Sequence, residues 1–240
     1  MALKVLHPEL QVSVTADRFL REIKLVSRID HPLVARVLDS GEAEWLVYYV
    51  MPFVEGPTLR SHLDAVHRLS VDDTVRLGRD LLGALGAAHR IGIMHRDVKP
   101  ENVVLSQRGA VLLDFGIARA IEAAGTTQLT RSGIAVGTSH YMSPEQVQAA
   151  SDVDHRSDLY SLGCLLYECL AGHAPFRHPN EVVVLQMHLN ERPPDLREVR
   201  PEAPEALVAV IGRAMDKNRE GRWQTAAEMS EALAPAAAAR

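Results

Sequence analysis

The feature that most constrains this 240-residue chain is a pair of polar segments separated by a short apolar stretch. The first segment, residues 95–102, reads His-Arg-Asp-Val-Lys-Pro-Glu-Asn, and the second, 114–116, reads Asp-Phe-Gly. Between them lie two apolar runs, 103–105 and 111–113, which are split by a Ser-Gln-Arg-Gly turn. Short apolar runs around a turn that contains glycine predict a pair of strands in a hairpin.

Three polar side chains lie at the ends of this predicted hairpin, and we expect it to bring Asp97, Asn102 and Asp114 together. Two carboxylates and an amide oxygen are hard ligands that suit Mg²⁺ and phosphate chemistry better than Zn²⁺ or a redox metal. A proton-accepting aspartate beside them suits the activation of a hydroxyl. Each residue also has a simpler interpretation: Asp97 as a helix cap, Asp114 as a turn residue and Lys99 as a surface charge.

Together the two segments resemble the catalytic core of eukaryotic-like (Hanks-type) protein kinases, and the Lys-Pro-Glu-Asn form resembles their bacterial serine/threonine branch. The resemblance covers residues 2–233. It implies an α+β, bilobal protein-kinase-like fold with a β-rich small lobe and a large, mainly helical lobe. The expected division is an incomplete small lobe at 1–53, a large lobe at 54–233 and an Ala-rich tail at 234–240.

The resemblance assigns a role in phosphoryl transfer to each polar residue of the two segments. Asp97 is expected to orient a protein Ser or Thr hydroxyl and to take its proton, while Lys99 reaches the γ-phosphate of ATP. Asn102 and Asp114 are expected to hold Mg²⁺. Thr138 resembles the substrate-facing threonine that contacts Asp97 and Lys99 in serine/threonine kinases. ATP and Mg²⁺ are therefore the expected cofactors, and proteins with Ser or Thr are the expected substrates.

The start of the chain resembles the strand of the small lobe that carries an adenine-facing alanine and a phosphate-binding lysine. Ala2 and Lys4 occupy these positions. Glu22 lies in a predicted helix that begins near residue 18, at the position of the glutamate that pairs with this lysine in the family. The other residues that the resemblance places at the adenine site are Met51 as gatekeeper, the Pro52 carbonyl, the Val54 N–H and Val104.

One part of the family pattern is missing. The sequence contains no G-x-G-x-x-G, although the family has a glycine-rich loop and two strands before its lysine. We therefore expect a chain shortened at its N-terminus, with an unpaired strand edge at Lys4. An internal valine codon taken as a start codon would produce this beginning.

The resemblance also implies regulation. Arg96 is expected to pair with a phosphorylated residue of an activation loop that spans 117–142. This loop contains several hydroxyl residues, and Thr130 and Ser132 are the preferred phosphorylation candidates. A homodimer is one arrangement in which two copies could phosphorylate each other's loop.

Three further residues are expected to have structural roles. Glu145, in a Ser-Pro-Glu segment, should form a buried ion pair with Arg222 and so anchor the activation loop. Asp158 is expected to accept hydrogen bonds from the backbone of residues 95–102. A simpler alternative for Asp158 is an N-cap at the start of the following helix.

Hydrophobic periodicity and turn residues divide the remaining chain. Strands are expected at 34–38 and 45–51, around a turn at 39–41. The helices are expected at 58–65, 71–90, 159–171, 180–189, 204–215 and 225–233.

Composition excludes several classes of protein. The net charge is −5 and the basic residues are scattered, which gives no electrostatic case for a nucleic-acid or membrane-surface partner. No apolar run approaches the ~18 residues of a spanning helix. Cys164 and Cys169 lie in an apolar run without metal-ligand spacing and are expected to be buried thiols, which fits a cytoplasmic location.

Two alternatives to an active protein kinase remain open. One is a truncated or non-catalytic kinase-like binding module, which the missing glycine-rich loop favours and the retained polar residues oppose. The other is a small-molecule phosphotransferase of related fold. Lys99, the Ser-Pro-Glu segment and the Thr-bearing loop argue against that second alternative, because these parts serve a peptide substrate and loop control.

Overall fold

The computed structural model describes residues 1–5, 16–43, 46–115 and 138–234, and the statements below concern these residues. The side chains of residues 16–19, 22 and 138 also lie outside the description. The predicted loop phosphorylation sites Thr130 and Ser132, and the glycine at 116, therefore fall outside the described residues. So do the side chains of Glu22 and Thr138.

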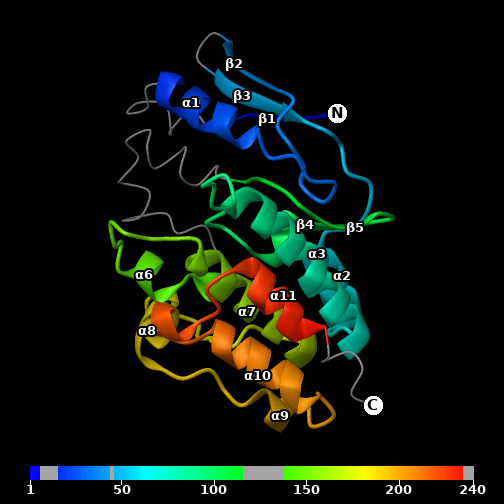
Figure 1. Ribbon diagram of the computed structural model, residues 1–240, viewed down its shortest axis with the longest axis vertical. Coiled ribbons are helices and arrows are strands. Elements are labelled where there is room, and N and C mark those ends of the chain that lie inside the picture. Colours follow the sequence, from blue (N-terminus) through cyan, green and yellow to red (C-terminus); the bar gives the residue numbers. More distant parts are fainter. Residues whose placement is uncertain (6–15, 44–45, 116–137, 235–240) are drawn as a thin grey trace.

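The molecule has a small β-rich part and a larger helical part, as Figure 1 shows. The small part contains helix α1 (Ala16–Val26) and a three-stranded antiparallel sheet with the strand order β1-β3-β2. Its strands are β1 (Ala2–Val5), β2 (Asp39–Ala43) and β3 (Leu46–Met51). This arrangement confirms the expected α+β, bilobal kinase-like fold.

The central strand β3 determines which side chains face the interior of the small part. Its residues alternate, so that Val47, Tyr49 and Met51 are buried while their neighbours are less so. Ala2 lies opposite Met51 and Lys4 lies opposite Tyr49 in the ladder with β1. The register therefore places Ala2 and Lys4 over the same inner face as Tyr49 and Met51.

The predicted strand at 34–38 and turn at 39–41 are wrong. Residues 39–41 belong to β2, and Gly41 sits there because a Cβ at this position would lie 2.8 Å from the Tyr48 hydroxyl. The preceding backbone pairs elsewhere: Ala35 N donates to Leu112 O (3.0 Å) and Leu112 N donates to Leu33 O (2.9 Å). The apolar residues of this segment thus pack between the two parts, and glycine serves a close approach rather than a turn.

The predicted hairpin in the larger part is present, with a shifted second strand. Strands β4 (Val103–Ser106) and β5 (Gly109–Leu112) pair antiparallel, with Ser106 opposite Gly109. Leu113 leaves the strand, and its N–H donates to the Asn102 carbonyl at 2.8 Å. The strand ends that carry the polar segments are therefore joined by a backbone hydrogen bond.

The helices of the larger part begin one residue after several of the predicted starts, because those residues are N-caps. Thr58, Asn180 and Thr225 each accept a backbone N–H of the first turn with the side chain and remain outside the helix. The bounds are α2 Leu59–Val66, α3 Val71–His89, α6 Pro144–Val147, α7 Arg156–Ala171, α8 Glu181–Asn190, α9 Leu196–Val199, α10 Glu205–Ala214 and α11 Ala226–Leu233, with 3₁₀ turns at Pro100–Asn102, Thr138–Tyr141 and Arg219–Gly221.

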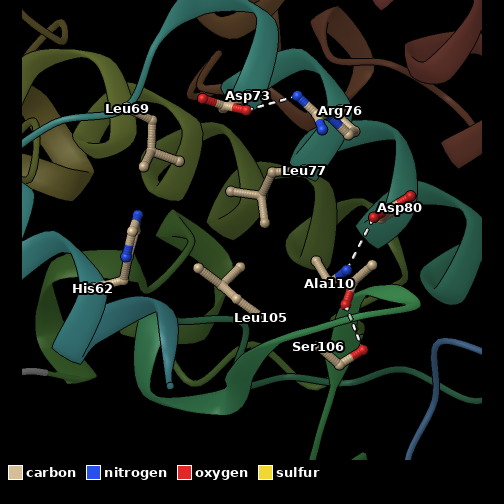
Figure 2. A pocket seen from close by; sticks show the side chains of 10 residues that line it. His62, Leu69, Asp73, Arg76, Leu77, Asp80, Leu105, Ser106 and Ala110 are labelled. Atoms are coloured by element: carbon tan, nitrogen blue, oxygen red, sulfur yellow. Dashed lines mark hydrogen bonds and ion pairs between the residues drawn. The ribbon is translucent and has the colours of Figure 1, made fainter. Parts of the chain in front are cut away.

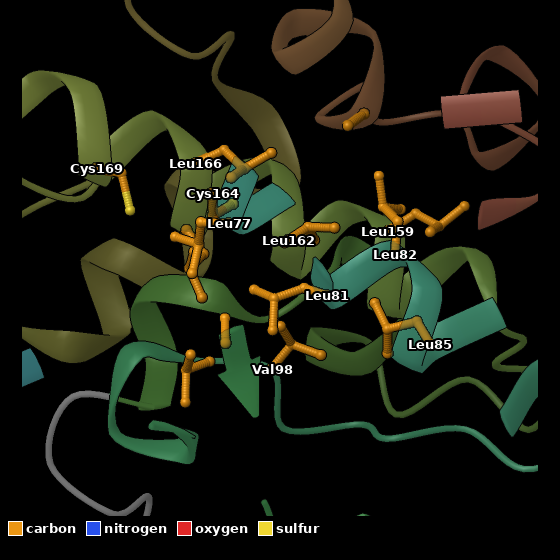
Figure 3. Close-up of a cluster of buried hydrophobic side chains, with 14 of the residues drawn as sticks. Leu77, Leu81, Leu82, Leu85, Val98, Leu159, Leu162, Cys164, Leu166 and Cys169 are labelled. Atoms are coloured by element: carbon orange, nitrogen blue, oxygen red, sulfur yellow. The ribbon is translucent and has the colours of Figure 1, made fainter. Parts of the chain in front are cut away.

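Helix α7 is the centre of the larger part, since every residue from Ser157 to Leu170 is buried. A helix that is buried on all sides must be covered by its neighbours, and α3 and α10 pack against it. Figure 3 shows the leucines of α3, including Leu81 and Leu85, facing the side chains of α7. Cys164 and Cys169 lie in this core as free thiols, and burial raises the pKa of both, that of Cys164 to about 12.

The described helices were also compared with the requirements for crossing a bilayer. None of those within the described ranges is both long enough and apolar enough to span a membrane.

Truncation of the core should test this packing. Leu81 is 0% exposed between α3 and α7, so Leu81→Ala removes buried methyl groups and leaves a cavity. We expect the free energy of unfolding to fall by about 2–5 kcal/mol, measured by urea denaturation. The control Leu25→Ala, on the exposed face of α1, should change it by about 0.5 kcal/mol or less. Similar losses in both variants would contradict the assigned core.

Candidate active site

The buried carboxylate of Asp158 fixes the polar segment 95–102. It accepts hydrogen bonds from the backbone N–H groups of His95 at 2.8 Å and Arg96 at 2.7 Å. His89 Nε2 on α3 lies 2.8 Å from the same carboxylate. Helix α7 begins at Arg156 with His155 as its N-cap, so the alternative that Asp158 caps this helix is wrong. Its side chain instead holds two consecutive N–H groups, and Arg96 adopts a positive φ of 68° there.

His95 connects this segment to the strand that carries Asp114. Its Nε2–H donates to the Leu113 carbonyl at 2.7 Å, which leaves Nδ1 to accept the backbone N–H of Asp97 at 3.2 Å. The imidazole also packs edge-on against the Phe115 ring, with centroids 4.6 Å apart. His95 and Phe115 are both fully buried, so they set the spacing between the two polar segments.

The structure brings Asp97, Lys99 and Asn102 together. Lys99 Nζ lies 2.8 Å from Asp97 Oδ2, and Asn102 Nδ2 lies 3.0 Å from the same oxygen. Asn102 Nδ2 also donates to the Asp97 carbonyl at 2.8 Å. The carboxylate is thus held by one cation and one amide, while its side chain keeps 26% of its surface exposed.

Asp114 follows Leu113, whose N–H donates to the Asn102 carbonyl, and it contacts the small part of the molecule. Its Oδ2 forms an ion pair with Lys4 Nζ, and its Oδ1 accepts a hydrogen bond from the Tyr49 hydroxyl at 2.9 Å. In this structure Lys4 therefore pairs with Asp114. The expected Lys4–Glu22 pair lies outside the described side chains, and Asp114 itself adopts a positive φ of 60°.

The residues expected at the adenine site lie on β1, at the end of β3, on the segment that follows β3 and on β4. Met51 is buried opposite Ala2, and Val54 packs against the same apolar cluster. The chain then reaches Gly56, where a Cβ would lie 2.1 Å from the Leu105 carbonyl, so only glycine fits at this close approach to β4. Val104 of β4 is buried nearby. Pro52, half-buried between Met51 and an exposed Phe53, has no described hydrogen bond that tests its carbonyl role.

The expected contact between Glu145 and Arg222 is present. Arg222 Nη1 and Nη2 donate to the two Glu145 oxygens at 2.7 and 2.9 Å, and Ser157 Oγ contacts the same carboxylate. Burial would raise the pKa of Glu145, but the hydrogen bonds from Arg222 and Ser157 outweigh it and hold this pKa below its usual value.

Comparison with known proteins agrees with this geometry. Residues 1–233 match the family described as the protein kinase domain. The chain belongs to the protein kinase family. It is 41% identical over 235 residues to a serine/threonine-protein kinase PknB of Mycobacterium leprae, an alignment that covers 95% of this chain and 37% of that protein.

Two further kinases are similar. A probable serine/threonine-protein kinase PknB of Bifidobacterium longum is 38% identical over 239 residues, covering 95% of this chain and 34% of that protein. A probable serine/threonine-protein kinase of Streptomyces coelicolor is 40% identical over 217 residues, an alignment that covers 88% of this chain and 32% of that protein. The chain thus spans about a third of the length of these relatives, and it is a Hanks-type kinase domain of bacterial type.

Several residues of this kinase domain connect its loops without having been predicted. Gln146 completes a capping box with Ser143 at the start of α6, and its Nε2 donates to the Arg96 carbonyl at 2.7 Å. The sequence did offer a signal, because a serine followed by glutamine three residues later is the capping-box pattern. The contact with Arg96, 50 residues away, had no local signal.

A second unpredicted network surrounds Arg60 of α2. Its guanidinium donates to Glu101 at 2.9 Å, to Glu168 at 2.9 Å and to the Tyr141 hydroxyl at 2.7 Å. Burial and the neighbouring Glu168 raise the pKa of Tyr141, so this phenol stays protonated and donates to Glu168. The network connects Glu101, in the segment after Asp97, to Tyr141 at the end of the 3₁₀ turn Thr138–Tyr141.

The chemistry of the kinase donor set fits a magnesium ion. Asn102 and Asp114 offer an amide oxygen and a carboxylate, and Asn102 turns its Nδ2 toward Asp97, which leaves Oδ1 as its ligand atom. Within the described ranges no three His, Cys, Asp or Glu side chains form a group that could hold a metal. The oxygen donors of Asn102 and Asp114 fit Mg²⁺, because this ion usually takes few protein ligands and completes its shell with phosphate oxygens and water.

A pocket of about 270 Å³ lies elsewhere in the kinase domain, between α2, α3 and the β4–β5 hairpin (Figure 2). Its acidic side chains are already engaged: Asp80 accepts from Ala110 N at 2.9 Å, and Asp73 pairs with Arg76 at 2.7 Å. None of the predicted site residues lines it. The pocket is therefore separate from the kinase site.

The Glu145–Arg222 pair generates a prediction with a defined pH dependence. Because the pKa of Glu145 is depressed in the folded state, its contribution to stability is present above the ordinary glutamate pKa of about 4.3 and is lost as the pH falls through the lower folded value. Glu145→Gln should lower the free energy of unfolding at pH 7 by about 3–5 kcal/mol, since Arg222 remains buried without its anion. The free energy of unfolding of this variant should also depend less on pH in the acid range than that of the unmutated chain. Urea denaturation at pH 7 and at about pH 3, below the ordinary glutamate pKa, measures both effects.

The control for this prediction is Glu220→Gln. The Glu220 carboxylate is 68% exposed and pairs with Arg156 at 3.0 Å. Loss of an exposed pair should change stability by about 1 kcal/mol or less. An equally small effect of Glu145→Gln would show that the buried pair does not anchor this region.

Proposed function

We propose that this chain transfers the γ-phosphoryl group of ATP to Ser or Thr hydroxyls of proteins. The observation that carries the proposal is the contact of both Lys99 and Asn102 with the single Asp97 oxygen Oδ2. In this proposal the other carboxylate oxygen, Oδ1, receives the incoming hydroxyl. The names of the similar kinases support the same activity.

Asp97 acts on the hydroxyl in this mechanism. A Ser or Thr hydroxyl is too weak an acid to ionise beforehand, so Asp97 aligns its oxygen and accepts its proton late in the reaction. The oxygen forms a bond to the γ-phosphorus as the bond to the ADP oxygen breaks. Lys99 provides positive charge beside the transferred group, and the ion pair with Asp97 keeps its amine at that position.

The phosphates lie between the two parts of the molecule in this proposal. Asn102 and Asp114 would hold the metal ion, which would supply positive charge to offset the negative charge of the phosphates. Lys4 lies next to Asp114 and has a flexible side chain that is 41% exposed, so it can turn from the carboxylate to the α- and β-phosphates. Ala2, Met51, Pro52, Val54 and Val104 form the proposed adenine site.

Regulation and partners follow from the same proposal. Arg96 would pair with a phosphorylated loop residue, for which Thr130 and Ser132 are the candidates, and Thr138 would contact the substrate side. Autophosphorylation between two copies of the chain is proposed as the activating reaction. A cytoplasmic location is proposed because it supplies ATP and keeps Cys164 and Cys169 as thiols.

The two alternatives have less support. A non-catalytic binding module does not require Lys99 and Asn102 to contact the Asp97 carboxylate. A small-molecule phosphotransferase does not require the Glu145–Arg222 anchor that follows the activation loop. The similar proteins carry the names of protein kinases and not of small-molecule enzymes.

The experiment that tests the proposal is phosphate transfer from labelled ATP with Mg²⁺ to the chain itself and to a Ser/Thr-rich protein substrate. Asp97→Asn should lower turnover by about 10²- to 10⁴-fold, because the proton acceptor is lost while the nucleotide site is retained. Binding of a fluorescent ATP analogue should be unchanged. The control Asp30→Asn, at an exposed position, should behave as the unmutated chain. Equal label in the Asp97 variant would refute the assignment.

A further inference from the structure

The Tyr49 side chain is the polar exception in the apolar cluster of the small part. The other buried members of this cluster are aliphatic or thioether side chains: Ile23, Ala35, Val47, Met51 and Val111. Tyr49 is 3% exposed, and its hydroxyl is bonded to Asp114 Oδ1 at 2.9 Å. Burial of a phenol hydroxyl is unfavourable unless it is hydrogen-bonded, so this bond explains why a tyrosine rather than a phenylalanine fits the position.

Lys4 and Tyr49 approach Asp114 from directly opposite positions of one ladder. They are paired across β1 and β3, and each contacts a different oxygen of the carboxylate. The two donors differ in kind. Lys4 is flexible, charged and 41% exposed on its side chain, whereas Tyr49 is a neutral donor fixed in a packed core.

Because of these differences, the Lys4–Asp114 and Tyr49–Asp114 contacts have different roles in the proposed enzyme. When Lys4 turns to the phosphates, Asp114 loses that partner and has a positive φ that its backbone alone does not favour. Tyr49 has no such second role. A carboxylate has about four acceptor sites, so a bond from Tyr49 to Oδ1 leaves room for a metal on the same group.

We propose that Tyr49 is a positioning residue for the metal-holding carboxylate: its hydroxyl fixes the orientation of Asp114 toward the Mg²⁺ of the nucleotide complex. This inference rests on the proposed function, because it assumes that Asp114 holds the metal. Groups that orient a metal ligand contribute to metal affinity although they do not touch the metal, and their loss typically weakens binding about 10- to 100-fold.

The direct test is metal binding rather than turnover. Mn²⁺ binding to the chain with the non-hydrolysable nucleotide AMP-PNP is measured by electron paramagnetic resonance, for the unmutated chain and three variants. Tyr49→Phe keeps the ring in the core and removes only the hydroxyl, and we expect its Mn²⁺ affinity to fall about tenfold. Asp114→Asn provides the level of binding without the carboxylate. Thermal unfolding checks that each variant is folded.

Tyr48→Phe is the matched control. Tyr48 is the adjacent residue of β3, and its hydroxyl lies over Gly41 rather than at Asp114. It should bind Mn²⁺ as the unmutated chain does. In turnover assays, Tyr49→Phe should raise the Mg²⁺ concentration needed for half-maximal rate about tenfold and leave the KM for the protein substrate unchanged.

The outcomes distinguish the two proposals. Weaker Mn²⁺ binding in Tyr49→Phe alone among the tyrosine variants supports the inference. Unchanged or tighter binding in Tyr49→Phe, with binding still dependent on Asp114, overturns it and leaves the proposed function in place. Equal binding by the unmutated chain and Asp114→Asn overturns both, because Asp114 would then hold no metal.

Discussion

The structure of the catalytic segment depends on one buried carboxylate. Asp158 holds the N–H groups of His95 and Arg96 on two oxygens and receives a third contact from His89. Burial would raise the pKa of Asp158, but the contacts with His89 and His95 outweigh it and lower this pKa. The group is therefore a fixed anion inside the larger part. A rigid anchor of this kind is what allows a loop to hold catalytic geometry.

The adjacent residue of α7 extends this anchoring to a second loop. Ser157 contacts the Glu145 carboxylate, which is paired with Arg222, while Asp158 holds the catalytic segment. Gln146, the neighbour of Glu145, donates to the Arg96 carbonyl. The first turn of one buried helix thus positions both the segment that carries Asp97 and the segment that follows the activation loop.

The two parts of the molecule are joined by two kinds of contact, one through side chains and one through the backbone. Asp114 meets Lys4 and Tyr49 of the small sheet, and Leu112 pairs with the backbone of residues 33–35. The first contact involves side chains that can exchange partners, whereas the second is a backbone pairing that cannot change without loss of hydrogen bonds. The two parts are therefore joined both by side-chain contacts at Asp114 and by backbone hydrogen bonds at Leu112.

Much of the fold could be predicted from the sequence because its signals are local. The helix caps, the β4–β5 hairpin and the buried α7 follow from periodicity, turn residues and capping side chains. The strand at 34–38 could not be predicted correctly, since its backbone partner Leu112 is far away in sequence. Gly41 was misinterpreted for the same reason: its role is contact with Tyr48 and not a turn.

The sequence by itself determined which groups are proposed to carry the chemistry: the resemblance to protein kinases singles out Asp97, Lys99, Asn102 and Asp114. Only the tertiary structure decided what supports them. The Tyr49 hydroxyl and Asp114 are 65 residues apart, and Arg60 is 108 residues from Glu168. Neither pair has a periodic or local signal, because such contacts arise only when separate elements pack and a buried polar group must find a partner.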